Sequence, residues 1–302
     1  MSTRFVFVTD SHYYPDAPKD YGAPKMLTRG RPVMEAVVPA VNALQPDFIV
    51  HGGDLLCGGS SFELPRETFL RSIGEVAEVF AGFEAPFYCI PGNHDADAQQ
   101  GSFADFQKQF PLPQPLTIVE AAPHLHLALS HIYHQCDPIE EGSGVWTDEL
   151  DQALRQAATR AWEQRCALIL VLHSWMLPGY EAGAGMVQNA DRLLATVCEH
   201  PAIVAVFAGH RHRNRIRTYR DFLIVDTACL IGFPLGFREI ELCDDGYFSV
   251  RFHALDLPEI IQASAARSNA AENNGWQGEI HDRETAILVP RLKEIWHRRG
   301  AA

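Results

Sequence analysis

The sequence predicts an α/β fold in which two β-sheets pack on each other and are covered by helices. Short apolar runs, each the length of one strand, alternate with segments of helical spacing over the first two thirds of the chain. From about residue 222 the pattern changes to consecutive strand-like segments. The chain has 302 residues, which is enough for one large domain or two small ones.

Six apolar runs are predicted to be buried strands, because they are short and rich in aliphatic and aromatic residues. They are FVFV (5–8), FIV (48–50), FYCI (87–90), LHLAL (125–129), ALILVL (167–172) and IVAVFA (203–208). Helical spacing predicts helices over 32–45, 66–82, 147–164 and 189–199. The first begins at Pro32, and proline suits a first helical turn.

The segments FLIVDTA, REIELCDD and YFSVRFHAL, which begin at Phe222, are predicted to form consecutive antiparallel hairpins, with Asp245-Gly246 as one turn. We therefore expect a main domain over 1–256 and a C-terminal extension over 257–302. Within the extension, residues 263–282 are polar and predicted to be loop-like. A final amphipathic segment places Leu288, Leu292, Ile295 and Trp296 on one helical face. That face must be covered by the main domain or by a second subunit, which would make a homo-oligomer.

Composition excludes several functional classes. Lysine and arginine number 25 and aspartate and glutamate 38, a formal charge of −13, so a general nucleic-acid partner is not expected. No apolar run approaches the ~20 residues of a membrane span, and no signal-peptide pattern appears, so no membrane association is expected. Seven cysteines without a CxxC pair favour a reducing, cytoplasmic location.

Residues of metal-ligand type follow five of the apolar runs. The five clusters are Asp10-Ser11-His12, His51-Gly52-Gly53-Asp54, Gly92-Asn93-His94-Asp95, His173 and Gly209-His210-Arg211-His212. In open α/β sheets, sites form at the carboxyl ends of strands, so these clusters should converge in space. Imidazole suits zinc, iron and manganese, and carboxylates suit hard ions. An extended backbone should place Asp10 and His12 on one side, and glycines beside Asp54, Asn93 and His210 should permit tight turns and close backbone approach.

Each cluster alone is common, but the ordered set of five resembles the calcineurin-like metallophosphoesterase superfamily. Its pattern is D-x-H, G-D, G-N-H-D/E, H and G-H-x-H, and the resemblance spans residues 10–212. It implies a four-layer α/β/β/α arrangement, a double β-sandwich flanked by helices.

The resemblance also implies two divalent metal ions, manganese, iron or zinc, with a role for each matching residue. The first ion would be held by Asp10, His12, Asp54 and His212. The second would be held by Asp54, Asn93, His173 and His210, so that Asp54 bridges the two. His94 would act beside the scissile phosphate as electrostatic partner or general acid, Asn93 would help to stabilise it, and Asp95 would support His94 or a ligand.

Within the superfamily, the sequence is most similar to the class III branch of cyclic-nucleotide and glycerophosphodiester phosphodiesterases. GVWTDELDQAL (144–154) and GFPLGFREIEL (232–242) carry this weaker resemblance. Cys57 departs from it, because many members have an acid there. Gly58 and Gly59 stand where a protein phosphatase needs arginine.

The expected function is hydrolysis of a small organic phosphodiester by a metal-activated hydroxide. The alternatives are a nucleotide pyrophosphatase of the ADP-ribose or CDP-alcohol type, a phosphomonoesterase, or a non-enzymatic scaffold, which the complete ligand set disfavours. The partner expected is a small phosphorylated substrate. The run Arg211–Arg217 is either an exposed strand face or a basic rim, and Tyr13, Tyr14, Arg29 and Arg31 lie in a loop that could line a pocket. His51 is expected to pack beneath the site.

Overall fold

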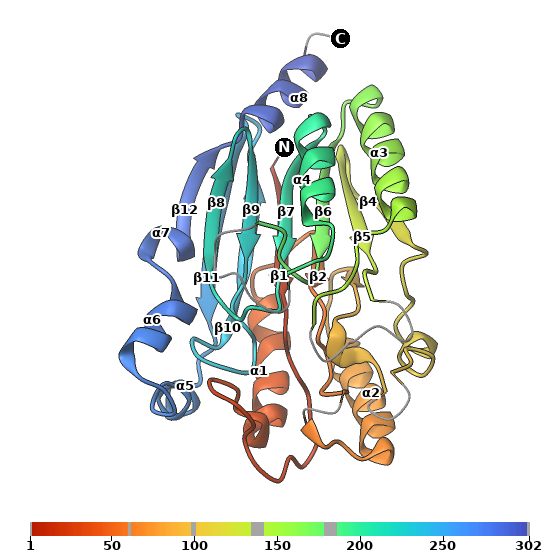
Figure 1. Ribbon diagram of the computed structural model, residues 1–302. Coiled ribbons are helices and arrows are strands. Elements are labelled where there is room, and N and C mark those ends of the chain that lie inside the picture. The colour runs from red at the N-terminus through yellow and green to blue at the C-terminus, as the bar shows by residue number, and fades with distance from the viewer. Residues whose placement is uncertain (1, 60–61, 98–100, 134–141, 178–185, 301–302) are drawn as a thin grey trace.

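The computed structural model describes residues 2–59, 62–97, 101–133, 142–177 and 186–300. Two six-stranded sheets pack on each other (Figure 1). The first sheet has the order β12 (Glu284–Leu288), β11 (Tyr247–Ala254), β10 (Gly236–Leu242), β1 (Thr3–Val8), β2 (Phe48–His51) and β3 (Phe87–Cys89). The second has the order β4 (Leu116–Ala122), β5 (Leu125–Ser130), β6 (Ala167–Leu172), β7 (Ile203–Ala208), β9 (Phe222–Asp226) and β8 (Arg215–Tyr219).

Side-chain alternation along the strands produces the four layers. In β1, Phe5 and Phe7 belong to the core between the sheets, where they meet Phe207 of β7. Val6 and Val8 face the other way and pack under α1 (Gly30–Asn42) and α2 (Arg66–Phe80). A separate cluster lies under α3 (Asp148–Glu163) and α4 (Ala190–Glu199), which cover the second sheet. The predicted α/β/β/α fold is confirmed.

All six predicted apolar runs form strands, and the four predicted helices are present with their ends shifted by at most three residues. The hairpin prediction is only partly right. β10 and β11 form an antiparallel hairpin whose turn contains Gly246 at φ +90. However, β9 lies in the second sheet, parallel to β7 and antiparallel to β8, so the chain crosses between the sheets after Asp226.

The extension contains more structure than its composition predicts. It comprises α5 (Pro258–Ala265), α6 (Ala270–Gln277), the short α7 (Ile280–Arg283), β12 and α8 (Pro290–Gly300). The prediction of a loop over 263–282 is wrong, because Asn269 and Glu272 form a capping box that starts α6. β12 adds to the free edge of β11.

Of the two predicted coverings of the final apolar segment, main domain or second subunit, the structure shows packing on the main body, but the prediction that Leu288 lies on the same helix is wrong. Leu292 and Ile295 of α8 are fully buried between the sheets, whereas Leu288 belongs to β12 and is 37% exposed. The division at residue 256 and the homo-oligomer stay predictions. Within the described residues, no helix has the length and apolar character needed to cross a membrane.

Candidate metal centre

The carboxyl ends of strands from both sheets meet at one edge of the sandwich. β1, β2 and β3 are parallel neighbours in the first sheet, and β6 and β7 are parallel neighbours in the second. The residues that follow them converge in three groups, in each of which the candidate ligand atoms lie within 4.8 Å of one another. The groups are Asp10, His12 and His212; His12, Asp54 and His94; and Asp54, His173 and His210.

The first group joins the two sheets. His212 Nε2 lies 3.1 Å from Asp10 Oδ1 and 3.1 Å from His12 Nε2. His12 Nε2 lies 3.6 Å from Asp54 Oδ2. Asp10 and His12 come from the first sheet, and His212 follows β7 of the second.

The group of Asp54, His173 and His210 is arranged around the same Asp54 oxygen and forms the other half of the centre. His173 Nε2 lies 3.2 Å from Asp54 Oδ2 and 3.3 Å from His210 Nδ1. His210 Nδ1 is also 3.0 Å from Asn93 Oδ1, so the amide belongs to this group. Asp54 Oδ2 therefore faces ligand atoms of both groups.

The donor set fits divalent ions. Nitrogen ligands lie about 2.0–2.1 Å from zinc, so two ligand atoms on one ion are roughly 2.9–3.4 Å apart. The 3.1 Å between the His12 and His212 nitrogens and the 3.3 Å between those of His173 and His210 match this spacing. His173 Nδ1 donates to Gly52 O at 2.7 Å, which leaves the Nε2 lone pair facing the centre.

Five ligand residues adopt a backbone conformation that most side chains avoid. All five lie in the left-handed region, with φ values of 54 for Asp10, 40 for His12, 55 for Asp54, 65 for His210 and 54 for His212. Aspartate and histidine are among the residues that tolerate this region, and such strain is concentrated at functional sites. The expectation that an extended backbone aligns Asp10 and His12 is therefore wrong, because both lie beyond the end of β1 at positive φ.

Two glycines allow the backbone to approach the carboxylates. A Cβ at Gly92 would lie 2.2 Å from Asp54 Oδ1, and one at Gly209 would lie 2.4 Å from Asp10 Oδ2. The expected close approach beside Asn93 and His210 is confirmed, and no larger residue fits at either position.

The surroundings of the buried histidines raise the pKa of some imidazoles and lower the pKa of others. Burial opposes charge on Asp10 and Asp54, but nearby histidines, chiefly His212 for Asp10 and His173 for Asp54, bring the pKa of each carboxyl below its ordinary value. Burial also opposes charge on His173, but Asp54 outweighs it and raises the pKa of His173 to about 9. Burial lowers the pKa of His210 to about 3, with the charge of His173 acting in the same direction.

His212 behaves like His173. Burial lowers its pKa, but the neighbouring Cys229 and Asp10 outweigh this and raise the pKa to about 10. Without metal, His173 and His212 therefore hold protons at neutral pH. Both rings must lose those protons to become ligands.

His94, Asn93 and Asp95 lie in the short helix η3 (Asn93–Asp95) at the centre. The His94 backbone N–H donates to Asp54 Oδ1 at 2.8 Å, and His94 Nδ1 lies 2.7 Å from Gly58 O. Because a carbonyl can only accept, Nδ1 carries the proton, and Nε2 is left for a substrate. Asp95 accepts from Gly92 N–H at 2.8 Å and Leu56 N–H at 2.9 Å, so it ties together the two turns that carry Asn93 and Asp54.

Several side chains around the ligands were missed by sequence reasoning. The rings of Phe62 and His94 are 4.7 Å apart, and Trp175 stacks on His210 at 5.6 Å. Lys25 and Cys229 also lie near the ligands. These residues come from connecting segments with no periodicity or motif, so the sequence carries no signal for them.

Other residues singled out in the sequence now have positions. The buried Cys57 thiol donates to His12 O at 2.9 Å, so it supports a ligand loop. His51 packs beneath the site as expected, with Nε2 3.0 Å from Ser11 Oγ. The Arg211–Arg217 run is not one exposed face, because Arg211 lies 4.1 Å from the Trp175 ring and Arg215 pairs with Asp282 at 2.8 Å.

The tyrosines and arginines singled out in the loop after the first metal motif mostly contact other parts of the protein. Tyr13 and Tyr14 are buried, and the Tyr13 hydroxyl donates to Glu75. Arg31 pairs with Glu35 at 2.8 Å. Arg29 ends a short helical turn and lines a shallow hollow near Asp256 and Leu257. None of these contacts assigns a pocket role to the loop.

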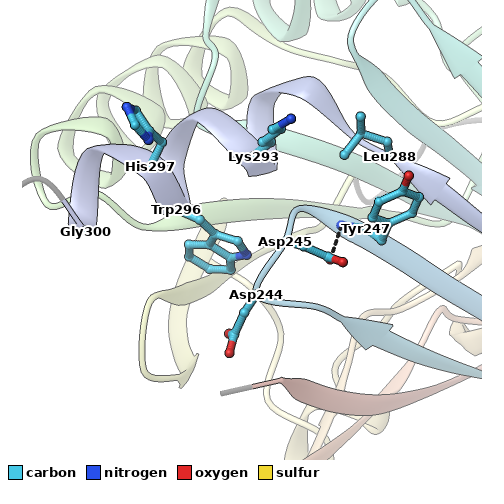
Figure 2. A pocket seen from close by; sticks show the side chains of 8 residues that line it. All are labelled: Asp244, Asp245, Tyr247, Leu288, Lys293, Trp296, His297 and Gly300. Atoms are coloured by element: carbon cyan, nitrogen blue, oxygen red, sulfur yellow. Dashed lines mark hydrogen bonds between the residues drawn. The ribbon is translucent and has the colours of Figure 1, made fainter.

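A hollow of about 650 Å³ lies at the other end of the strands (Figure 2). It is lined by Asp244, Asp245, Tyr247, Leu288, Lys293, Trp296, His297 and Gly300. Leu242 of β10 pairs with Thr3 at the start of β1, whereas Asp10 follows the end of β1. The β10–β11 turn in this hollow is therefore remote from the metal centre.

The fold and the Asp/His groups are suited to holding divalent metal ions at the edge where the two sheets meet. Residues 3–214 match the family of calcineurin-like phosphoesterases, and the chain belongs to that family. Membership makes it a metal-dependent phosphoric ester hydrolase, and the family and the Asp/His groups indicate a dinuclear centre.

Solved structures share the fold at low sequence identity. A dimetal phosphatase from Danio rerio is 12% identical, with a TM-score of 0.71, and the match covers 83% of this chain and 96% of that one. A putative 5'-nucleotidase from Staphylococcus aureus, solved in complex with alpha-ketoglutarate, is 13% identical with a TM-score of 0.54, covering 88% of this chain and 58% of that one. No curated protein matches the sequence.

Proposed function

We propose that the protein is a dinuclear metal-dependent phosphodiesterase that hydrolyses a small organic phosphodiester. The observation that carries the proposal is the position of Asp54, whose Oδ2 lies 3.6 Å from His12 Nε2 in one ligand group and 3.2 Å from His173 Nε2 in the other. A carboxylate shared in this way suits two ions close enough to act on one phosphate, about 3.5–4 Å apart.

The surroundings of Asp54 support a diester over a monoester. The next residues, Leu55, Leu56 and Cys57, are fully buried and bring no cation to the phosphate. A diester phosphate carries one negative charge and two free oxygens, which two ions with Asn93 and His94 can satisfy. A monoester dianion would require a further positive group at the scissile phosphate itself.

Bound ions, Asn93 and His94 would have different roles in the hydrolysis. Bound ions would supply Lewis-acid activation of water and of the phosphoryl oxygens. Asn93, placed by η3, would hold its amide against the substrate and one ligand group. Burial lowers the pKa of His94, so its ring is neutral before substrate binds. An anionic phosphate beside Nε2 would raise that pKa and draw a proton there, ready for the leaving oxygen.

The test compares two chromogenic esters with manganese-loaded protein. We expect kcat/KM for bis-p-nitrophenyl phosphate to exceed that for p-nitrophenyl phosphate. The variant Asp54→Asn, which lacks the shared carboxylate, is the inactive control, and Asp47→Asn removes an exposed carboxylate and should behave as wild type.

Three results would overturn the diester assignment. An equal or reversed preference would indicate a phosphomonoesterase. Hydrolysis of ADP-ribose alone would indicate a nucleotide pyrophosphatase. Failure to hydrolyse any ester with the metals bound would leave only a scaffold role.

A further inference from the structure

Lys25 brings a positive charge close to the metal centre, although it belongs to none of the ligand motifs. Its Nζ lies 5.2 Å from the centre of the Phe62 ring. That ring is in turn 4.7 Å from the His94 ring and 5.7 Å from the His12 ring. Burial lowers the pKa of both histidines, and the charge of Lys25 lowers each further.

The charge of Lys25 is not neutralised by the described part of the chain. No described carboxylate lies within ion-pair distance of its ammonium, whose contact is the face of Phe62. Lys19 in the same loop provides the contrast, because it is 61% exposed and lies 3.8 Å from Glu63. In a protein of net charge −13, a partly buried cation that has no ion pair among the described residues suits an anionic ligand.

The backbone that carries Lys25 is fixed on both sides. Met26 N–H donates to Ile231 O at 2.9 Å, and Lys25 forms a β-bridge with Gly232. From the C-terminal extension, the buried Ser264 hydroxyl donates to Pro24 O at 2.6 Å, and the Arg267 guanidinium donates to Lys25 O. These bonds fix the backbone at Lys25 before any ligand arrives, so binding has only the lysine side chain to order.

We propose that Lys25 forms a subsite for a second oxyanion of the substrate, a phosphoryl or carboxylate group next to the scissile phosphate. Lys25 Nζ and the His94 ring both pack on Phe62, 5.2 Å and 4.7 Å from the centre of its ring, so the lysine lies beside the expected phosphate site and outside the candidate ligand groups. Two ions already neutralise the scissile phosphate, whereas a second anionic group would otherwise face an acidic protein. This inference rests on the proposed function and narrows it to phosphodiesters that carry another anionic group.

The experiment measures binding by calorimetry and needs no turnover. Manganese-loaded wild type, Lys25→Met, Lys25→Arg and the matched control Lys19→Met are each titrated with inorganic phosphate, phosphonoacetate and pyrophosphate. A charge-assisted hydrogen bond is typically worth about 10-fold or more in affinity. We expect Lys25→Met to weaken at least one of the two-anion probes by about 10-fold and phosphate by less than about twofold. Lys25→Arg should recover most of the loss, and Lys19→Met should match wild type.

The probes separate the two sources of the second anion. Loss confined to pyrophosphate assigns the subsite to a phosphoryl group, and loss that includes phosphonoacetate extends it to carboxylates. An equal loss for phosphate would place Lys25 on the metal-bound phosphate itself and overturn the proposal, as would no loss for any probe. Metal content and melting temperature, measured on each variant, show that it is folded and loaded. Because binding is read directly, a protein inactive on diesters would refute the proposed function and leave this result standing.

Discussion

Asp54 is the residue on which both halves of the metal centre depend. Its Oδ1 accepts the His94 N–H at 2.8 Å, while Oδ2 faces His173 and His12. Asp10, by contrast, belongs to one of the candidate ligand groups formed by the described residues, the one with His12 and His212. The two carboxylates are equally buried. Their replacement therefore separates the effect of a shared ligand from that of burial.

We predict that Asp54→Asn loses both metal ions, whereas Asp10→Asn loses mainly one. Asparagine keeps an oxygen for the His94 N–H and is close to aspartate in volume, so the turn is retained and the missing charge dominates. Elemental analysis after gel filtration measures the metal content. Two ions per chain in Asp54→Asn, or equal losses in the two variants, would contradict the shared role.

The ligand residues could be predicted from the sequence, but their neighbours could not. Five of them lie one to four residues after the end of a strand, and parallel strands in one sheet place their ends together; these are Asp10, Asp54, Asn93, His173 and His210. Side chains such as Lys25 and Phe62 reach the centre from long loops, where contact depends on tertiary bonds. The bond from Arg267 to Lys25 O, for example, joins residues far apart in the chain.

At the scale of elements, α8 joins parts of the fold that are far apart in sequence. Arg291 is 3% exposed and donates to Val197 O at 2.7 Å and to Ile203 O at 2.8 Å. Val197 belongs to the last turn of α4, whose unpaired carbonyls favour a cation. The guanidinium also pairs with Asp221 at 2.8 Å. The extension therefore adds a strand to the first sheet and caps a helix on the second.

Two leucines in the extension test whether α8 completes the core. Leu292 is fully buried between the sheets, and Leu288 is 37% exposed at the end of β12. We predict that Leu292→Ala lowers the free energy of unfolding by about 2–5 kcal/mol, through lost burial and a cavity. Leu288→Ala should cost less than about 1 kcal/mol.

Denaturant unfolding of the metal-free variants provides this comparison. Similar costs for the two substitutions would show that α8 lies on the core without contributing to it. An unchanged Leu292→Ala protein would contradict the burial directly.

Helices whose apolar residues repeat regularly could be predicted from the sequence. Features that depend on tertiary contacts, such as the sheet to which a strand belongs, could not. α3 and α4 have amphipathic spacing and lie within one residue of their predicted ends. β9 and β10 were both predicted as strands of one hairpin series, but Leu223 pairs with Ala205 in one sheet and Phe237 pairs with His253 in the other. Local pattern identifies a strand without identifying its sheet. The prediction of a loop in the extension failed because its small polar residues are typical of loops, although two of them form the capping box that starts α6.

At the scale of the whole molecule, the metal centre connects the two sheets. Each ligand set contains residues from both, since Asp10, His12, Asp54 and Asn93 follow strands of the first sheet and His173, His210 and His212 follow strands of the second. Ions bound here would cross-link the sandwich. Because they bind the folded state and not the unfolded chain, they should raise the stability of the entire fold.

This stabilisation should increase with pH, and the raised pKa values of His173 and His212, about 9 and about 10, fix the sign. Both values lie above the ordinary 6.5, so in the metal-free protein the charged rings stabilise the fold fully below pH 6.5. That contribution is lost as pH rises through about 9 and about 10. The lowered pKa values of Asp10 and Asp54 keep both carboxylates ionised throughout this range, so they do not alter the trend.

Metal binding must displace the two protons, so the combined affinity should rise by up to about 100-fold per pH unit below the two pKa values. We therefore predict that the difference in melting temperature between manganese-loaded and chelated protein is larger at pH 8 than at pH 6.5, since both pH values lie below the raised pKa values of His173 and His212.

Calorimetry in buffers of different ionisation enthalpy should show release of about two protons per chain on metal binding at neutral pH. The variant His173→Asn should release one proton fewer. The control His253→Asn, which changes a histidine of β11 that pairs with Glu239 of β10, should release as many protons as wild type. A temperature difference that is constant or falls with pH would show that His173 and His212 are not protonated ligands in the metal-free fold.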